Sequence, residues 1–230
     1  MALLNDKDRK YLENEFAERL KNPVKLVVFT QTIACEYCRE TEQIAREVGE
    51  LSPKLSVEVY NFVTDKGVAE QYGIDKIPAT AVIGARDYGI RFYGVPAGYE
   101  FTTLVEDILD VSAGESGLSA AAKEALGRIT TPVTLQVFVT PTCPYCPSAV
   151  SLAHKMALES EHIRGEMVES IEFPHLVQRY SVMGVPRTVI NETVFIDGAV
   201  PETVMIDRVL EAAGLAIPRM VDHAVPPEEL

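Results

Sequence analysis

The sequence lacks the features of a membrane or secreted protein. It has no apolar run of the ~18 residues that a membrane-spanning helix needs. Its first residues, from Met1 to Tyr11, are polar and charged and lack the apolar stretch of a secretory signal. We therefore expect a cytoplasmic protein that does not enter a membrane.

Basic residues are also scarce. The chain has 21 Lys and Arg against 34 Asp and Glu, which gives a net charge of −13. The acidic excess is spread over both halves and leaves no basic stripe that would neutralise phosphates. We therefore expect neither nucleic acid nor an anionic membrane surface as a partner, and we interpret the charge as a means of keeping the protein dissolved.

Three further features are missing from the sequence, and they bear on its source and on the cofactors it could bind. Tryptophan is absent, and Asn and Gln together number only 10, a shortage of thermolabile amides that is typical of thermophile proteins. No glycine pattern typical of a phosphate loop is present. The histidines have no metal-ligand spacing, so we assign surface or packing roles to His154, His162, His175 and His223. We expect no metal and no cofactor.

Cysteine is rare as well, but its four occurrences form two Cys-x-x-Cys pairs, Cys35–Cys38 and Cys143–Cys146. Paired cysteines with none left over indicate metal or redox chemistry in a cytoplasmic chain. Four thiolates could jointly bind one zinc ion in a structural or interaction module. Each pair, however, has its own complete strand–helix context, which favours redox chemistry.

The second half of the chain repeats the first. The two cysteine pairs are 108 residues apart, and so are Pro78 and Pro186. This period is too long for a solenoid, whose repeats run ~20–50 residues, and it suits a duplicated domain. We predict two domains, residues 1–115 and 116–230, joined at the small and polar stretch 112–117.

Each half predicts the same succession of elements. A helix and a buried strand lead into the cysteine turn, and a helix, a strand, a short helix, a two-stranded hairpin and a closing helix follow. In the first half these elements are expected at 6–20, 25–30, 38–50, 56–62, 67–72, 79–84, 90–94 and 101–111, and in the second half at 119–129, 133–139, 146–158, 163–168, 174–180, 187–191, 193–198 and 202–213. This pattern predicts an α/β protein of two tandem domains, each with a mixed central sheet flanked by helices.

The motif Cys143-Pro144-Tyr145-Cys146 follows an apolar strand and opens a helix. At a helix N-terminus the unpaired backbone N–H groups and the macrodipole stabilise a thiolate. We therefore predict that Cys143 is the nucleophile that forms a mixed disulfide with the substrate. Cys146, one helical turn later, is the resolving thiol that releases it.

The motif Cys35-Glu36-Tyr37-Cys38 repeats this geometry, with Cys35 as nucleophile and Cys38 as resolving thiol. Glu36 places a negative charge beside the nucleophile and should weaken the stabilisation of its thiolate. We predict two unequal sites, of which Cys143 has the more acidic thiol.

Each cysteine motif is accompanied by a proline at the same distance along the chain. Pro78 and Pro186 each follow the first cysteine of their pair by 43 residues, at the start of a strand. With these prolines and the cysteine motifs, both halves resemble the thioredoxin superfamily. In that family the corresponding X–Pro bond is cis, faces the cysteines and presents a strand-like edge to the substrate. The resemblance implies substrate binding by Ile77, Pro78, Val185 and Pro186. Tyr37 and Tyr145, inside the motifs, are expected to shape the substrate face.

The tandem arrangement resembles the glutaredoxin-like protein disulfide oxidoreductases of thermophilic archaea and bacteria, which consist of two fused thioredoxin folds. The resemblance covers nearly the whole chain, and Cys143-Pro144-Tyr145-Cys146 has the glutaredoxin-type sequence. It implies reduction, oxidation and isomerisation of protein disulfides, with a flavin-dependent thioredoxin reductase as electron donor. An alternative is a dedicated electron carrier to a peroxidase, like the tandem thioredoxin-like module of peroxiredoxin reductases. In that module the first copy has typically lost its cysteines, whereas here both pairs are present.

Two positions depart from the family patterns. Thioredoxins carry a buried acid six residues before the first cysteine, where this chain has Phe29 and Val137. The sequence therefore names no proton acceptor for the resolving cysteine. Glutaredoxins have a Gly-Gly segment after the cis-proline strand, where this chain has Asn191-Glu192-Thr193. This difference counts against glutathione as a substrate.

Overall fold

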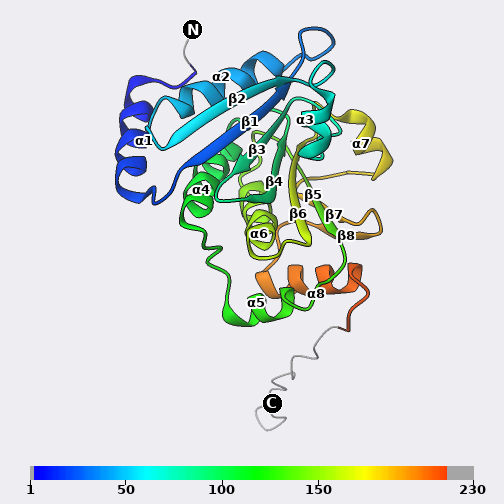
Figure 1. The fold of residues 1–230 in the computed structure, drawn as a ribbon. Coiled ribbons are helices and arrows are strands. Elements are labelled where there is room, and N and C mark those ends of the chain that lie inside the picture. Colours follow the sequence, from blue (N-terminus) through cyan, green and yellow to red (C-terminus); the bar gives the residue numbers. More distant parts are fainter. Residues whose placement is uncertain (1–2, 217–230) are drawn as a thin grey trace, which may run out of the picture.

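The computed structural model describes residues 3–216, so that His223 lies outside the described part of the chain (Figure 1). Within residues 3–216, no helix is long and apolar enough to cross a membrane. In chain order the elements are α1 Asp6–Arg19, β1 Val24–Thr30, α2 Cys38–Gly49, β2 Leu55–Asn61, α3 Lys66–Gln71, β3 Ala79–Ile83, β4 Asp87–Tyr93, α4 Tyr99–Ala113, α5 Ala120–Leu126, β5 Val133–Val139, α6 Cys146–Glu159, β6 Ile163–Glu169, α7 Pro174–Arg179, β7 Arg187–Ile190, β8 Val194–Asp197 and α8 Glu202–Ala212.

Each predicted helix and strand is present, and the largest differences are at four ends. Helix α4 begins at Tyr99 instead of residue 101. Strand β4 begins at Asp87 instead of residue 90. Helix α4 continues to Ala113, inside the expected linker, and ends because Gly114 adopts a left-handed φ of 70°. Helix α5 ends at Leu126 instead of residue 129, where Gly127 lowers the helix propensity.

The strands form one eight-stranded sheet in the order β2-β1-β3-β4-β6-β5-β7-β8. The second half repeats the strand order of the first, in agreement with the duplication seen in the sequence. In each half the first two strands pair in parallel, and the remaining pairs are antiparallel. The predicted α/β class with mixed sheets is therefore confirmed, whereas the boundary between residues 115 and 116 stays a prediction.

The two half-sheets are joined edge to edge. Strand β4 pairs in parallel with β6, from Ile90 opposite Gly165 to Tyr93 opposite Val168. This pairing satisfies the backbone groups of two strands that would otherwise be sheet edges. The sequence predicts the two half-sheets but not this junction.

Alternating side chains of the strands enter two cores on opposite faces of the sheet. In β1, Leu26 and Val28 belong to the larger core, and Val27 and Phe29 to the smaller one. The short helices α3 and α7, which lie close together in Figure 1, cover the smaller core. The six other helices pack on the larger core.

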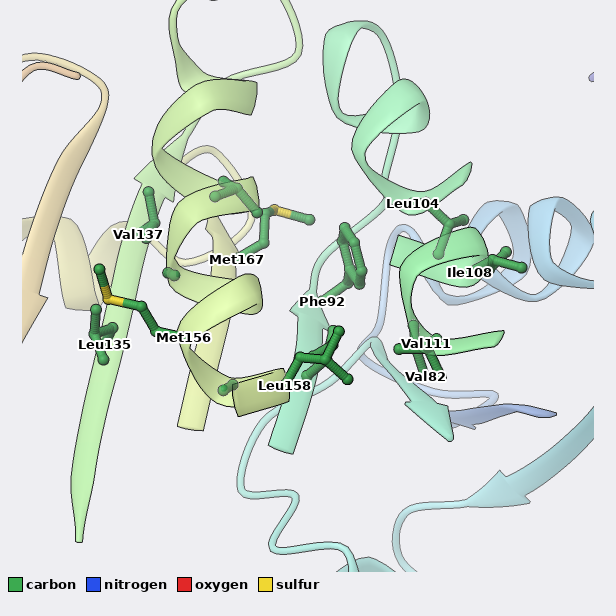
Figure 2. Close-up of a cluster of buried hydrophobic side chains, with 14 of the residues drawn as sticks. Val82, Phe92, Leu104, Ile108, Val111, Leu135, Val137, Met156, Leu158 and Met167 are labelled. Carbon is green, nitrogen blue, oxygen red and sulfur yellow. The ribbon is translucent and has the colours of Figure 1, made fainter. Parts of the chain in front are cut away.

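The larger core runs without interruption across the junction. Figure 2 shows the ring of Phe92, from β4, between Leu104 and Ile108 of α4 on one side and Met167 of β6 on the other. All four side chains are at most 1% exposed. Helix α4 of the first half also packs against α6 of the second half. The two halves therefore share the larger of the two hydrophobic cores.

On the opposite face, polar groups link the halves. Lys76 lies 3.5 Å from Glu166, which also pairs with Arg164 at 2.8 Å. Arg164 donates hydrogen bonds to the carbonyl of Gly73 at 2.6 Å and to the hydroxyl of Tyr93 at 2.9 Å. These charges are largely buried, so the loss of one partner would leave the other buried and unpaired.

Candidate functional site

The first cysteine pair lies where β1 passes into α2. Cys35 and Cys38 form a disulfide with their Cα atoms 5.5 Å apart. Cys38 opens α2 and is only 4% exposed, whereas Cys35, in the preceding loop, is partly exposed. The backbone N–H of Gln31 points at the Cys38 sulfur, 3.3 Å away. The predicted nucleophile is thus the more accessible sulfur of the pair.

The second pair occupies the corresponding place between β5 and α6. Cys143 and Cys146 form a disulfide with the same Cα separation of 5.5 Å. Cys146 opens α6 and is fully buried, and Cys143 is 8% exposed. Pro147 lies in the first turn of α6, where the missing N–H removes no helical hydrogen bond.

Both predicted proline segments lie beside their cysteines. The peptide bonds Ile77–Pro78 and Val185–Pro186 are cis. The Cys143 sulfur is 3.7 Å from the carbonyl oxygen of Val185. In the first half, Ile77, Pro78 and Cys35 line one cavity of about 290 Å³. Substrate binding by these segments stays a prediction, and the geometry places them next to Cys35 and Cys143.

The two motif tyrosines differ in their surroundings. Tyr37 is partly buried and lines the cavity with Cys35. Tyr145 is 70% exposed and projects to the surface. The expectation that both shape the substrate face stays a prediction, with Tyr37 enclosed by other residues of its site.

Carboxyl groups reach each cysteine region from the other half of the chain. Phe29 and Val137 are fully buried and apolar, so the strands supply no acid there. Instead, Glu172 of the second half lines the cavity of Cys35. Glu100 of the first half lies just after the contact of α4 with the loop that precedes Cys143. Neither glutamate was predicted from the sequence.

Helix α4 begins against the loop of the second cysteine pair. The backbone N–H of Tyr99 donates to the carbonyl of Pro141 at 3.1 Å. Gly98 has a φ of 60°, and a Cβ atom there would lie 2.1 Å from the same oxygen. A glycine is therefore required at this position. The close contact brings the first turn of α4 to the second site.

Glu100, in that first turn, is a buried carboxyl group. It is 1% exposed, and one of its oxygens accepts a hydrogen bond from the Thr103 hydroxyl at 2.9 Å. Its other oxygen, Oε1, has no protein partner. Burial raises the pKa of Glu100 to about 7, although the Thr103 hydrogen bond and the charge of His154 act in the opposite direction.

The Glu100→Gln variant should remove a pH dependence of stability. Because the folded-state pKa of Glu100 is raised to about 7 from 4.5, the wild type should lose about 2 kcal/mol of stability between pH 5 and pH 8 through this group. Urea unfolding at both pH values measures the effect. The exposed Glu106→Gln variant on the same helix is the control and should retain the wild-type slope. An unchanged slope in Glu100→Gln would contradict the assignment.

A second buried polar pair lies between α4 and α6. Nδ1 of His154 is 2.6 Å from the carboxylate of Asp107, and both side chains are at most 3% exposed. The His154 ring also contacts Phe92 edge-on, with centroids 4.9 Å apart. Burial raises the pKa of Asp107, and His154 opposes this shift. His154 therefore has a packing role, with an acidic partner that its sequence context did not indicate.

The two cysteine pairs differ in the charge around them. Near the first pair, the pKa of the Tyr37 phenol is raised by Glu36 above all, and further by Glu172, Glu169 and Glu40. At the position of Glu36 the second motif has the uncharged Pro144. In the reduced protein we expect a lower thiol pKa at Cys143 than at Cys35. Iodoacetamide alkylation against pH, in variants that keep one pair, measures both values; a lower pKa at Cys35 would contradict the prediction.

The chain is similar to solved structures over nearly its whole length. It covers 96% of a protein disulfide oxidoreductase from Aeropyrum pernix k1, with 93% of its own residues, a TM-score of 0.86 and 34% identity. It covers 99% of the NTD_N/C domain of alkylhydroperoxide reductase AhpF from Enterococcus faecalis (V583), with 90% of its own residues, a TM-score of 0.82 and 27% identity. A family model described as a thioredoxin domain matches residues 133–211.

Curated relatives are much longer than this chain. The alkyl hydroperoxide reductase AhpF of Pseudomonas aeruginosa is 32% identical over 112 residues, which are 49% of this chain and 22% of that protein. The AhpF protein of Escherichia coli (strain K12) is 24% identical over 204 residues, 89% of this chain and 37% of that protein. The chain thus spans well under half of the length of these two relatives.

Proposed function

This chain belongs to the protein disulfide oxidoreductases built from two tandem thioredoxin folds, and we propose that it exchanges disulfides and dithiols with protein substrates. One observation carries the proposal. Each half combines a Cys-x-x-Cys disulfide at the start of a helix with a cis X–Pro bond. We propose further that the two cysteine pairs are the only redox centres, and that the reaction takes place in the cytoplasm.

Reduction of a substrate starts at Cys143 in this proposal. Its thiolate attacks one sulfur of the substrate disulfide, so that a mixed disulfide forms and the first substrate thiolate leaves. Cys146 then loses its proton and attacks the Cys143 sulfur. The protein disulfide forms, the second substrate thiolate leaves, and two electrons have passed to the substrate. The reverse sequence oxidises a substrate dithiol.

The surroundings of Cys143 support this order of events. Cys143 precedes the first turn of α6, whose free N–H groups and dipole favour a thiolate over a thiol. Cys146 is fully buried, whereas Cys143 is 8% exposed, so a substrate disulfide meets Cys143 first. Beside them, the Val185–Pro186 segment offers a backbone edge to which an extended substrate chain can add as a strand.

We propose that a flavin-dependent thioredoxin reductase reduces the chain again. A second candidate function is delivery of electrons to a peroxide-reducing partner, because curated relatives carry the name alkyl hydroperoxide reductase. The presence of both cysteine pairs favours a general oxidoreductase over a dedicated carrier. Kinetics with a peroxidase as sole oxidant, compared with kinetics on insulin, distinguish the two.

A shared zinc site is inconsistent with the sheet. Strands β1 and β5, which lead to the two cysteine pairs, are separated by β3, β4 and β6. At ~4.8 Å between neighbours, they lie roughly 19 Å apart, whereas thiolates bind zinc at ~2.3 Å. Among residues 3–216, moreover, no group of three or more His, Cys, Asp or Glu is placed to hold a metal ion.

Dithiothreitol-driven reduction of insulin disulfides tests the proposed function. We expect the full chain to accelerate the precipitation of insulin B chains in catalytic amounts. Protein whose cysteines have first been alkylated is the control and should have no effect. A folded, unmodified protein that does not turn over would contradict activity on protein disulfides.

A further inference from the structure

The cavity at the first cysteine pair is built by both halves of the chain. Its first-half wall contains Cys35, Tyr37 and the cis-proline segment. Its remaining wall comes from Ile171 and Glu172, in the segment between β6 and α7, and from Pro174, the first residue of α7. This segment reaches the first site because β6 pairs with β4 at the junction. The first half alone would therefore leave its own site open on this side.

Glu172 is held in this wall by backbone contacts. The N–H of Val95 donates to its Oε1 at 2.6 Å, and its own N–H donates to the Glu169 carboxylate at 2.8 Å. The residue before Val95, Gly94, donates from its N–H to the carbonyl of the cis-proline Pro78 at 2.9 Å. One short backbone segment thus contacts both the cis-proline and the carboxyl group, and fixes the distance between them.

The carboxyl group of Glu172 keeps one oxygen without a protein partner. Its Oε2 atom is buried and accepts no hydrogen bond. Burial is the main cause that raises the pKa of Glu172 to about 7, and the negative charges of Glu169, Glu36 and Glu40 raise it further. A carboxyl group that is half ionised near pH 7 can both accept and return a proton there.

We propose that Glu172, from the second half of the chain, is the proton acceptor for the resolving cysteine of the first half, Cys38. The role presupposes that this pair undergoes thiol–disulfide exchange, as proposed above. In the resolving step the Cys38 proton passes to the Glu172 carboxylate, directly or through one water. The Cys38 sulfur bonds to the Cys35 sulfur, the bond between Cys35 and the substrate breaks, and the leaving substrate thiolate takes the proton from Glu172.

The second site has no carboxylate at the position that corresponds to Glu172. One repeat before Glu172 the sequence has Thr64, and the strand that corresponds to β4 in the second half is β8, which ends the sheet. The buried carboxyl group near the second pair is Glu100, which comes from α4 of the first half. The carboxyl groups near the two pairs therefore come from different elements and are not related by the repeat.

A two-phase reaction isolates the step. In a Cys143→Ser/Cys146→Ser parent, only the first pair reacts with a small aromatic disulfide such as dithiodipyridine. Attack by Cys35 releases one thiol in the first phase, and attack by Cys38 releases the other in the second phase. With Glu172→Gln added, we expect the second phase to slow by roughly 10- to 100-fold at pH 7. Its pH midpoint should move from near 7 toward that of an ordinary thiol, about 8.5.

Two further variants separate a proton transfer from a change of charge or shape. Glu40→Gln removes a nearby exposed charge and should change the second phase by less than about threefold, since solvent and salt screen it. Glu172→Asp keeps a carboxylate and should retain the low pH midpoint at a reduced rate.

An unchanged second phase in Glu172→Gln, or an equal slowing in Glu40→Gln, would overturn the role of Glu172. A parent that releases only one thiol would instead contradict disulfide exchange at this pair, and the assignment would fall with it.

Discussion

The Cys143→Ser/Cys146→Ser variant should lose insulin reduction by a factor on the order of 100 or more, because both the nucleophile and the resolving thiol are removed. Serine is close to cysteine in size, so the opening of α6 and the buried position of Cys146 should be preserved. The variant is measured under dithiothreitol next to the wild type, with circular dichroism to verify the fold.

The matched variant is Cys35→Ser/Cys38→Ser. The carboxylates around the first cavity should disfavour the Cys35 thiolate. We therefore expect the variant without the first cysteine pair to keep most of the insulin reduction. Two inactive variants would mean that the pairs work in series, with electrons relayed from one to the other. Loss of activity only in the Cys35→Ser/Cys38→Ser variant would contradict the assignment of the second pair as the working site.

The Phe92→Ala variant should lower the free energy of unfolding by about 3–5 kcal/mol, the usual cost of truncating a fully buried phenylalanine. Phe92 is fully buried between α4 and β6, so the cavity would open where the cores of the two halves meet (Figure 2). Chemical denaturation followed by fluorescence and circular dichroism measures the loss.

Phe195→Ala is the control for this effect. Phe195 lies on the end strand β8 and is 39% exposed, so its truncation should cost about 1 kcal/mol or less. Equal losses in the two variants would show that the junction core contributes no more than the surface of the sheet.

The elements of both halves were predictable because each has a local signal. The strand that contains Val27 and Phe29 has the apolar run 26–29 at its centre, and the cysteines mark the start of α2 and α6. The offset of 108 residues then transferred each assignment from one half to the other. The cis state of Pro78 and Pro186 was predictable only from the family resemblance, since most X–Pro bonds are trans.

The junction between the halves was not predictable in this way. Strand β4 meets β6 through backbone hydrogen bonds, which leave no trace in residue type. Glu172 and Glu100 were missed for a related reason: each lies near the cysteine pair of the half to which it does not belong. Their equivalents one repeat away are Thr64 and Arg208, so a comparison of the repeats gives no sign of them.

The junction of β4 with β6 joins two different edges of the repeated unit. It is a heterologous, head-to-tail contact, unlike the isologous contact of a twofold-symmetric dimer. In a twofold-symmetric pair, both copies make the contact with the same edge, and their surroundings are identical. In this chain one copy has its neighbour at the β4 edge and the other at the β6 edge, so the junction alone makes the two units non-equivalent, whatever residues their motifs contain.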